Sequence, residues 1–156
     1  LPLLKEEYPK IHYHIVGIPT IQQDLELVAE KLNVADHITF HGLVTEQKKQ
    51  QLLQESTIFA MLSTKTRTGD VEGFGIAIIE ANAIGLPAIG SNTSGIVDAI
   101  NNGVSGKLVD PTNKKAILNA VTEISDNYNS YAGNAKAWST KFEWEVIIKK
   151  YLKTFE

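Results

Sequence analysis

Cysteine is absent from this chain of 156 residues, and its absence excludes two kinds of chemistry. Without thiols the protein has neither a disulfide framework nor a thiolate nucleophile. A chain without disulfides fits a reducing compartment, so we expect a cytoplasmic location.

The sequence also has no strong excess of charge of one sign. It holds 15 Lys and Arg against 18 Asp and Glu, a formal net charge of −3 at pH 7, and the basic residues are scattered except near the C-terminal end. Proteins that bind nucleic acid carry a basic stripe or patch that pairs with phosphates. We therefore expect no nucleic-acid partner.

Long hydrophobic runs are missing too. No apolar stretch reaches the roughly 18 residues that a membrane span requires, and the opening segment LPLLKEEYPK does not have the pattern of a signal peptide. We therefore expect no transmembrane segment. The sequence does not begin with Met, so we expect it to be a piece of a longer protein.

What the sequence does contain is a regular alternation of strand-like and helix-like segments, with 43% hydrophobic residues. This is enough to bury the core of one domain. Runs rich in β-branched and aromatic residues, separated by helical patterns, predict strands over residues 11–17, 37–40, 57–62, 87–90 and 107–109. The alternation implies right-handed crossovers and a parallel sheet with helices on both faces, an α/β, Rossmann-like fold.

Two threonines are predicted to mark helix starts. Thr20 is expected to cap an amphipathic helix that runs to residue 33, and Thr45 to open a very polar helix that runs to Gln54.

The stretch EGFGIAIIEANAIGLP, from Glu72 to Pro87, is the part of the chain that carries chemistry. Its first two glycines permit a tight turn into an apolar run with the length of a buried helix. The first amides of that helix have no partners within it and lie at the positive end of its dipole. The amides of Phe74, Gly75 and Ile76 are therefore predicted to bind phosphate or sugar oxygens.

Glu80 lies one turn beyond Ile76 on this apolar helix. A carboxylate is costly to bury without partners, so we expect Glu80 to face the same polar cleft as Glu72 and to accept hydrogen bonds from ligand hydroxyls. A second interpretation stays open, because Gly-x-Gly often precedes a helix and an early glutamate can simply complement the helix dipole.

The fold class also predicts where the cleft lies. Ligands bind outside the carboxyl ends of the strands in open parallel sheets. The loops after Val16, Phe40, Leu62 and Ile89 are expected at that edge, and the loop before Glu72 is one of them.

This stretch resembles the signature of the retaining GT-B glycosyltransferases, the glycogen-synthase and sucrose-synthase-like enzymes. The matching residues are a Glu, Gly-Phe-Gly, a second Glu after seven intervening residues and Gly-x-Pro, that is Glu72, Gly73, Phe74, Gly75, Glu80, Gly85 and Pro87. Weaker similarity covers 38–42, 103–111 and 142–144. Nearly the whole chain is thus similar to the C-terminal, nucleotide-sugar-binding domain of that family. We therefore expect residues 1–156 to form that one domain.

The resemblance implies a role for each matching position. Glu72 becomes the catalytic-site residue that hydrogen-bonds the donor sugar, and Glu80 accepts from the ribose hydroxyls. The donor sugar and diphosphate meet Gly73, Phe74, Gly75 and Ile76.

The loop of His41, Gly42, Leu43 and Val44 corresponds to the family's loop that borders the nucleotide base. A plain turn between strand and helix is an equally good interpretation of these residues.

The resemblance implies a transferase of the hexosyltransferase class, acting in polysaccharide biosynthesis. It would move a sugar from a UDP, GDP or ADP sugar to a glycan or lipid acceptor, with no cofactor. The acceptor-binding domain and the diphosphate-clamping Arg and Lys would precede Leu1, so we expect the chain alone to be inactive. Any peripheral membrane association would come through that domain. The alternative is a non-catalytic nucleotide-binding or regulatory module on the same scaffold.

Other polar residues carry weaker signals. His12 and His14 share one strand face, but no third ligand is in register and we predict no metal site. Lys65 and Arg67 could reach a phosphate or an acceptor, or belong to a solvated loop. Asp70 forms an acidic pair with Glu72, which we do not assign to a metal because the matched family needs none for donor binding.

Overall fold

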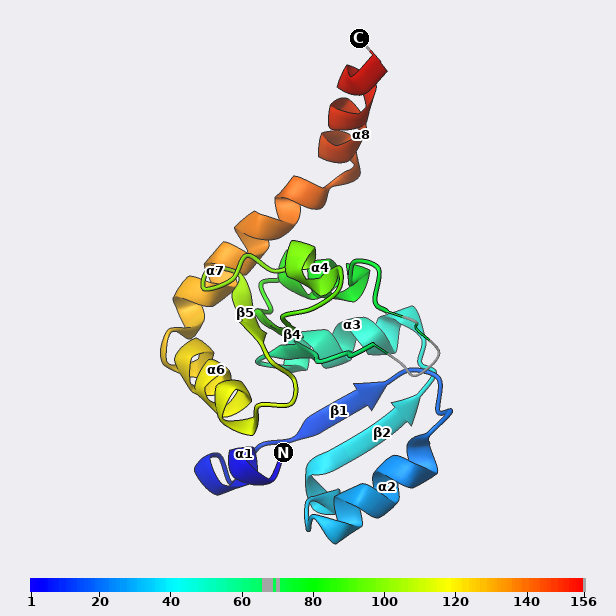
Figure 1. Cartoon of the computed structure of the whole chain (residues 1–156), viewed down its shortest axis with the longest axis vertical. Helices are drawn as coiled ribbons and strands as arrows, with labels where there is room; N and C mark the ends of the chain where they lie inside the picture. Colours follow the sequence, from blue (N-terminus) through cyan, green and yellow to red (C-terminus); the bar gives the residue numbers. More distant parts are fainter. Residues whose placement is uncertain (66–68, 70, 156) are drawn as a thin grey trace. The chain divides into compact units, whose positions relative to one another are not determined.

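The computed structural model describes residues 1–65, 69 and 71–155, which form two compact units, Leu1–Glu55 and Ser56–Glu156. Each unit has its own parallel sheet, and the two are described separately (Figure 1). Every helix in the described part of the chain is too short or too polar to cross a lipid bilayer.

The first unit is built on a two-stranded parallel sheet. Tyr13 lies opposite Ile38, and Val16 lies opposite Gly42, with an irregularity in register just before Val16. The elements of this unit are α1 (Pro2–Glu7), β1 (Tyr13–Val16), α2 (Gln22–Lys31), η1 (Ala35–His37), β2 (Ile38–Gly42) and α3 (Glu46–Glu55).

Strand β2 runs two residues further than the sequence predicts. His41 and Gly42, which were expected in a loop, are its last residues. Gly42 pairs with Val16, and its carbonyl accepts a hydrogen bond from the amide of Gly17 at 3.0 Å. The ladder therefore continues through a glycine with φ of 62°, a residue that hydrophobic patterning assigns to a turn.

The two predicted helix starts have different outcomes. The Thr45 hydroxyl accepts a hydrogen bond from the Lys48 amide at 3.2 Å, so Thr45 opens α3 as predicted. Thr20 does not cap α2, which begins at Gln22 after Ile21 and has no side-chain cap. The chain turns at Pro19, whose carbonyl accepts from the Gln22 amide at 3.4 Å, and this turn moves the helix start past the threonine.

The second unit has a three-stranded parallel sheet in the order β3–β4–β5. In the central strand, Ala88 pairs with Phe59 on one side and with Gly106 on the other. Its elements are β3 (Phe59–Met61), α4 (Ile76–Ala83), β4 (Ala88–Ser91), α5 (Ile96–Ala99), β5 (Gly106–Val109), α6 (Lys114–Asp126), α7 (Tyr128–Ser139), η2 (Thr140–Phe142), α8 (Trp144–Leu152) and η3 (Lys153–Phe155).

Helices cover both faces of this second sheet, as the sequence predicts. Successive side chains of a strand point to opposite faces. Ala88 packs in a cluster with Ile78 of α4 and Ile96 of α5. Its neighbour Ile89 packs in another cluster, with Ile124 of α6 and with Tyr131 of α7. The β4 strand is buried along its whole length, which explains its apolar sequence.

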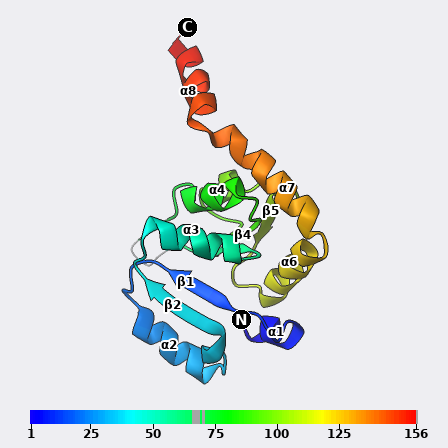
Figure 2. The ribbon, with the colours of Figure 1, turned by 180° about the vertical axis from the view of Figure 1, so that it is seen from behind.

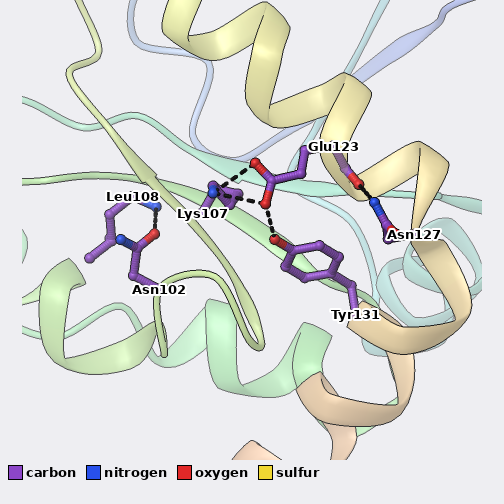
Figure 3. A network of polar contacts seen from close by, with 6 residues as sticks. All are labelled: Asn102, Lys107, Leu108, Glu123, Asn127 and Tyr131. Atoms are coloured by element: carbon purple, nitrogen blue, oxygen red, sulfur yellow. Dashed lines mark hydrogen bonds and ion pairs between the residues drawn. The ribbon is translucent and has the colours of Figure 1, made fainter.

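Polar contacts join the last strand of this sheet to the two helices that follow it (Figure 3). The ammonium of Lys107 in β5 lies 2.9 Å from Oε1 and 2.8 Å from Oε2 of Glu123 in α6. The hydroxyl of Tyr131 in α7 donates to Glu123 Oε1 at 2.6 Å. Figure 2 shows α6 and α7 from the opposite side, following each other along the chain.

The sequence predicts one parallel sheet, whereas the strand pairs of the described residues form two. The parallel direction of all five strands is as predicted. Hydrophobic patterning identifies strands and their crossovers but does not say which strands exchange hydrogen bonds, so the number of sheets was beyond its reach.

Candidate functional site

The loop between β3 and α4 brings the predicted donor-binding residues of the second unit to the start of a helix. Gly75 is the N-cap of α4 and has φ of 89°, a left-handed conformation that favours glycine. A Cβ added at this position would also lie 3.0 Å from Cδ1 of Ile78. The second glycine of Gly-Phe-Gly is therefore favoured by its conformation, and any other residue would also crowd the end of the Ile78 side chain.

The carboxylate of Glu72 turns back over this helix start. Its Oε1 accepts hydrogen bonds from the amide of Gly75 at 3.1 Å and from the amide of Phe74 at 3.5 Å. A negative charge is stabilised there by the donors and by the helix dipole. Two of the three amides that are predicted to bind an anion, those of Phe74 and Gly75, thus already bond to a carboxylate, and a ligand phosphate binding to them would have to displace the Glu72 side chain.

Glu80 lies on the exposed face of α4. It follows Ile76 by four residues, so the two side chains share one side of the helix, and Ile76 is 70% exposed. The opposite side carries the buried residues Ile78, Ala81 and Asn82. An orientation of Glu80 and Glu72 toward one common cleft remains a prediction.

A cavity of about 570 Å³ lies at the carboxyl edge of the second sheet. It is bordered by Val71, the neighbour of Glu72, but Glu72 and Glu80 are not among its lining residues. Polar side chains dominate the rest of its wall, which includes Lys65, Asn92, Ser94, Asp110 and Thr112.

Two residues of the cavity wall that are not among the predicted site residues have unusual local structure. Asp110 Oδ1 accepts from both the amide and the hydroxyl of Thr112, at 2.8 and 2.7 Å, and the hydroxyl bond above all lowers the pKa of this carboxyl. Ser94 has φ of 60°, and its hydroxyl is buried without a partner among the described residues. The Asp-x-Thr spacing is a sequence signal for the turn at Asp110.

Lys65 borders this cavity, while Arg67 and Asp70 lie outside the described residues. Asp98 is an exposed residue of α5.

A cluster of three aromatic rings joins the loop between β3 and α4 to the C-terminal part of the unit. The ring of Phe74 lies 5.3 Å from that of Phe142 in η2, and Phe142 lies 5.4 Å from Trp138 in α7, centroid to centroid. The indole of Trp138 donates to the carbonyl of Ala99 at 2.9 Å. The loop that carries Glu72 is therefore packed against two later elements.

The predicted base-binding residues belong to the first unit. Gly42 ends β2 and, with Gly17, lines an apolar cavity of about 120 Å³ at the carboxyl edge of the two-stranded sheet. Leu43 follows, is 75% exposed and, like Val44, is not among the lining residues.

The histidines of the first sheet bond to one another and to a hydroxyl. His14 Nδ1 lies 3.0 Å from His41 Nε2, and His12 Nε2 lies 2.8 Å from the hydroxyl of Thr39. Burial first, and then the nearby His14, lowers the pKa of His12. Within the residues that the structure describes, there is no group of three or more His, Cys, Asp or Glu side chains placed to hold a metal ion.

Parallel strands, covering helices and a glycine turn into α4 define an α/β domain of the Rossmann-like class. The sequence matches the family model described as Glycosyl transferases group 1 over residues 1–138. The chain belongs to this family, whose members among its relatives are GT-B glycosyltransferases.

Relatives of known name cover nearly all of this chain. It is 28% identical over 155 residues to the GDP-mannose-dependent alpha-(1-6)-phosphatidylinositol monomannoside mannosyltransferase of Mycobacterium tuberculosis (strain CDC 1551 / Oshkosh), a match over 96% of this chain and 40% of that protein. The chain spans about two fifths of the relative's length.

Solved structures share the fold. A glycosyltransferase from Rickettsia africae ESF-5 superposes with a TM-score of 0.82 at 22% identity, over 99% of this chain and 41% of that one. Anabaena HepE in complex with UDP and glucose superposes with a TM-score of 0.78 at 22% identity, over 97% and 42%.

Proposed function

We propose that this chain is the donor-binding domain of a retaining glycosyltransferase that transfers a sugar from a nucleotide-diphosphate sugar to a glycan or lipid acceptor. The observation that carries the proposal is the Glu72 loop, where a carboxylate and the amides of Phe74 and Gly75 meet at the glycine turn that leads into α4. The loop has, in the same order, the residues of the glycosyltransferase signature that the sequence resembles, and it lies within the part of the chain that the family model matches.

Two names among the similar proteins support a nucleotide-sugar donor. The Mycobacterium tuberculosis relative is named as GDP-mannose-dependent, and the Anabaena structure holds UDP and glucose. They differ in nucleotide and in sugar, so the proposal extends to the class of donor and not to one member of it.

The chemistry of the reaction explains why such a loop is useful. Breaking the bond between sugar and diphosphate leaves negative charge on the phosphate and an electron-poor sugar. Preorganised amides at the start of α4 would stabilise the leaving phosphate, while Glu72 would orient the sugar through its hydroxyls. No metal ion is part of this scheme, and Glu80 contributes by accepting from the ribose.

The hydrogen bonds of Glu72 add a step to this scheme. Its carboxylate occupies the amides of Phe74 and Gly75, which are the groups that would meet the donor. Donor binding would therefore exchange hydrogen-bond partners. A ligand oxygen would accept from the two amides, and the Glu72 carboxylate would turn to accept from the sugar hydroxyls. The exchange conserves charge-assisted hydrogen bonds on both sides, so it need not cost much free energy.

Calorimetry on the complete polypeptide that contains this chain tests the proposal. UDP-glucose, GDP-mannose and ADP-glucose are titrated in parallel with UDP, GDP and ADP, and the release of nucleotide in the presence of candidate acceptors is followed. We expect one nucleotide sugar to bind more tightly than its bare nucleotide and to be consumed. Binding without consumption would favour the non-catalytic module, and no binding by any of the six would contradict the proposal.

A further inference from the structure

Gly95, at the start of α5, lies so close to the backbone of the loop between β3 and α4 that a residue with a side chain would not fit in its place. A Cβ built on Gly95 would lie 1.8 Å from the carbonyl oxygen of Gly73 and 2.9 Å from the amide nitrogen of Phe74. The neighbouring atoms are backbone and not a movable side chain. Only glycine fits at this position with the loop where it is.

A hydrogen bond fixes the same two segments in register. The amide of Gly95 donates to the carbonyl of Glu72 at 3.1 Å. The preceding residue, Ser94, has φ of 60°, a left-handed conformation that residues other than glycine seldom adopt. A strained residue next to so close a contact indicates that the turn is held in place by its surroundings.

Glu72 is consequently held from two sides. Its carbonyl bonds to Gly95, and its carboxylate bonds to the amides of Gly75 and Phe74 at the start of α4. The position of the carboxylate depends on where the Glu72–Gly73 peptide lies, and that peptide rests on Gly95.

We propose that Gly95 is a positioning residue for the donor site: by having no side chain, it seats the Glu72–Gly73 peptide on the start of α5 and so fixes the backbone from which the Glu72 side chain reaches the donor. The inference rests on the proposed function, because it assigns Gly95 a task in holding the sugar-binding residue. Gly95 itself touches no ligand in this scheme.

The geometry sets the size of the effect. In Gly95→Ala the loop has to retreat by at least 1.2 Å, because the new Cβ would otherwise lie 1.8 Å from the Gly73 oxygen and real Cβ contacts are not shorter than 3.0 Å. A displacement of about 1 Å in a positioned group can cost roughly 100-fold in rate. We expect a loss of roughly 10- to 100-fold in the affinity that the sugar adds to the nucleotide.

The test compares Gly95→Ala with the unmodified complete polypeptide by calorimetry, using UDP-glucose against UDP and GDP-mannose against GDP. The measured quantity is the ratio of the two dissociation constants, which isolates the contribution of the sugar. Gly133→Ala is the matched control, because Gly133 is an exposed residue of α7 where an added Cβ meets nothing within 4 Å. We expect the two dissociation constants to become nearly equal in Gly95→Ala and to keep their original ratio in Gly133→Ala.

A double-mutant cycle separates positioning from general damage to the fold. If Gly95 acts through the Glu72 carboxylate, Gly95→Ala should change the ratio little once Glu72→Gln is present. Losses that multiply would overturn the proposal, as would an unchanged ratio in Gly95→Ala alone. Absence of nucleotide-sugar binding in the unmodified protein would instead contradict the proposed function.

Hydrogen exchange on the unmodified protein provides a test even if Gly95→Ala fails to fold. The Gly95 amide, which is bonded to the Glu72 carbonyl, should be protected and should open together with the Gly75 amide. Exchange of the Gly95 amide at the rate of an unstructured peptide, while the β4 amides stay protected, would show that the contact does not hold the loop.

Discussion

The carboxylates on either side of the start of α4 differ in their surroundings although both belong to the same motif. Glu72 is half-buried and bonded to backbone amides, whereas Glu80 is exposed on the helix one turn after Ile76. Their proposed tasks differ accordingly: Glu72 belongs to the sugar and Glu80 to the ribose.

Glu80→Gln tests the ribose contact. The substitution keeps the shape of the side chain but replaces charge-assisted hydrogen bonds to a diol, which costs ~1 to 3 kcal/mol or about 5- to 150-fold in affinity. Calorimetry with the preferred bare nucleotide measures the loss. Glu30→Gln, on the exposed side of α2, is the matched control and should bind normally. Equal affinity of Glu80→Gln and unmodified protein would remove Glu80 from the site.

The residues of the site were predictable where a local motif names them and unpredictable where contacts cross the fold. The left-handed Gly75 follows from Gly-Phe-Gly before an apolar helix. The contact of Gly95 with Gly73 does not, because it joins residues 22 positions apart and depends on β3 and β4 being neighbours in the sheet.

Among the elements, the contacts that join β5, α6 and α7 have a defined dependence on pH. The Lys107 ammonium and the Tyr131 hydroxyl hold the pKa of Glu123 below its usual range. Burial, followed by the hydrogen bond to Glu123, raises the pKa of Tyr131 from 10.0 to about 12. Protonation of Glu123 at acid pH should lower the free energy of unfolding only slightly, since the Glu123 side chain is 46% exposed and water screens its ion pair with Lys107.

The alkaline side gives a measurable prediction. Tyr131 keeps its proton in the folded protein up to about pH 12 but loses it near pH 10 when unfolded, so its contribution is complete below pH 10 and is lost between pH 10 and 12. In Tyr131→Phe we expect this part of the decline in unfolding free energy to vanish. At pH 8 the variant should be less stable by roughly 1 kcal/mol, for one lost hydrogen bond.

Urea denaturation at pH 8, 10 and 11.5, followed by circular dichroism, measures both effects. Tyr128→Phe, in the first turn of the same helix, is the control. If Tyr131→Phe lost stability between pH 10 and 11.5 as steeply as the unmodified protein, ionisation of Tyr131 would have no part in the alkaline transition.

Helix starts show how far local sequence reaches at the scale of elements. Thr45 caps α3 as predicted, by accepting from the Lys48 amide at 3.2 Å. Asn113 caps α6 by accepting from the Ala116 amide at 3.0 Å. The prediction that Thr20 caps α2 was wrong, because the backbone turns at Pro19 and the helix begins only after Ile21. A capping residue can be read from sequence only when the preceding backbone leaves it at the N-cap.

For the whole molecule, sequence alternation was enough to predict a parallel α/β fold, and the structural matches confirm it. The division into two units was not predictable, since it depends on which strands pair and not on where strands occur.

The length of the chain leads to a prediction about its activity. A polypeptide of residues 1–156 corresponds to about two fifths of the mannosyltransferase relative. We expect it to bind nucleotide sugars weakly and to transfer no sugar, since the remaining three fifths have no counterpart in it. Product formation from radiolabelled donor by the purified chain, above a Glu72→Gln control, would show this expectation to be wrong.

The aromatic cluster of Phe74, Trp138 and Phe142 gives the second unit an intrinsic fluorescent reporter. Trp138 touches Phe142, which touches Phe74 in the loop beside Glu72, while the only other indole, Trp144, is 72% exposed. Iodide should quench the emission of the exposed Trp144 more strongly than that of the half-buried Trp138. The unquenched fluorescence then follows movements of the loop in real time, without a dye and without altering any residue.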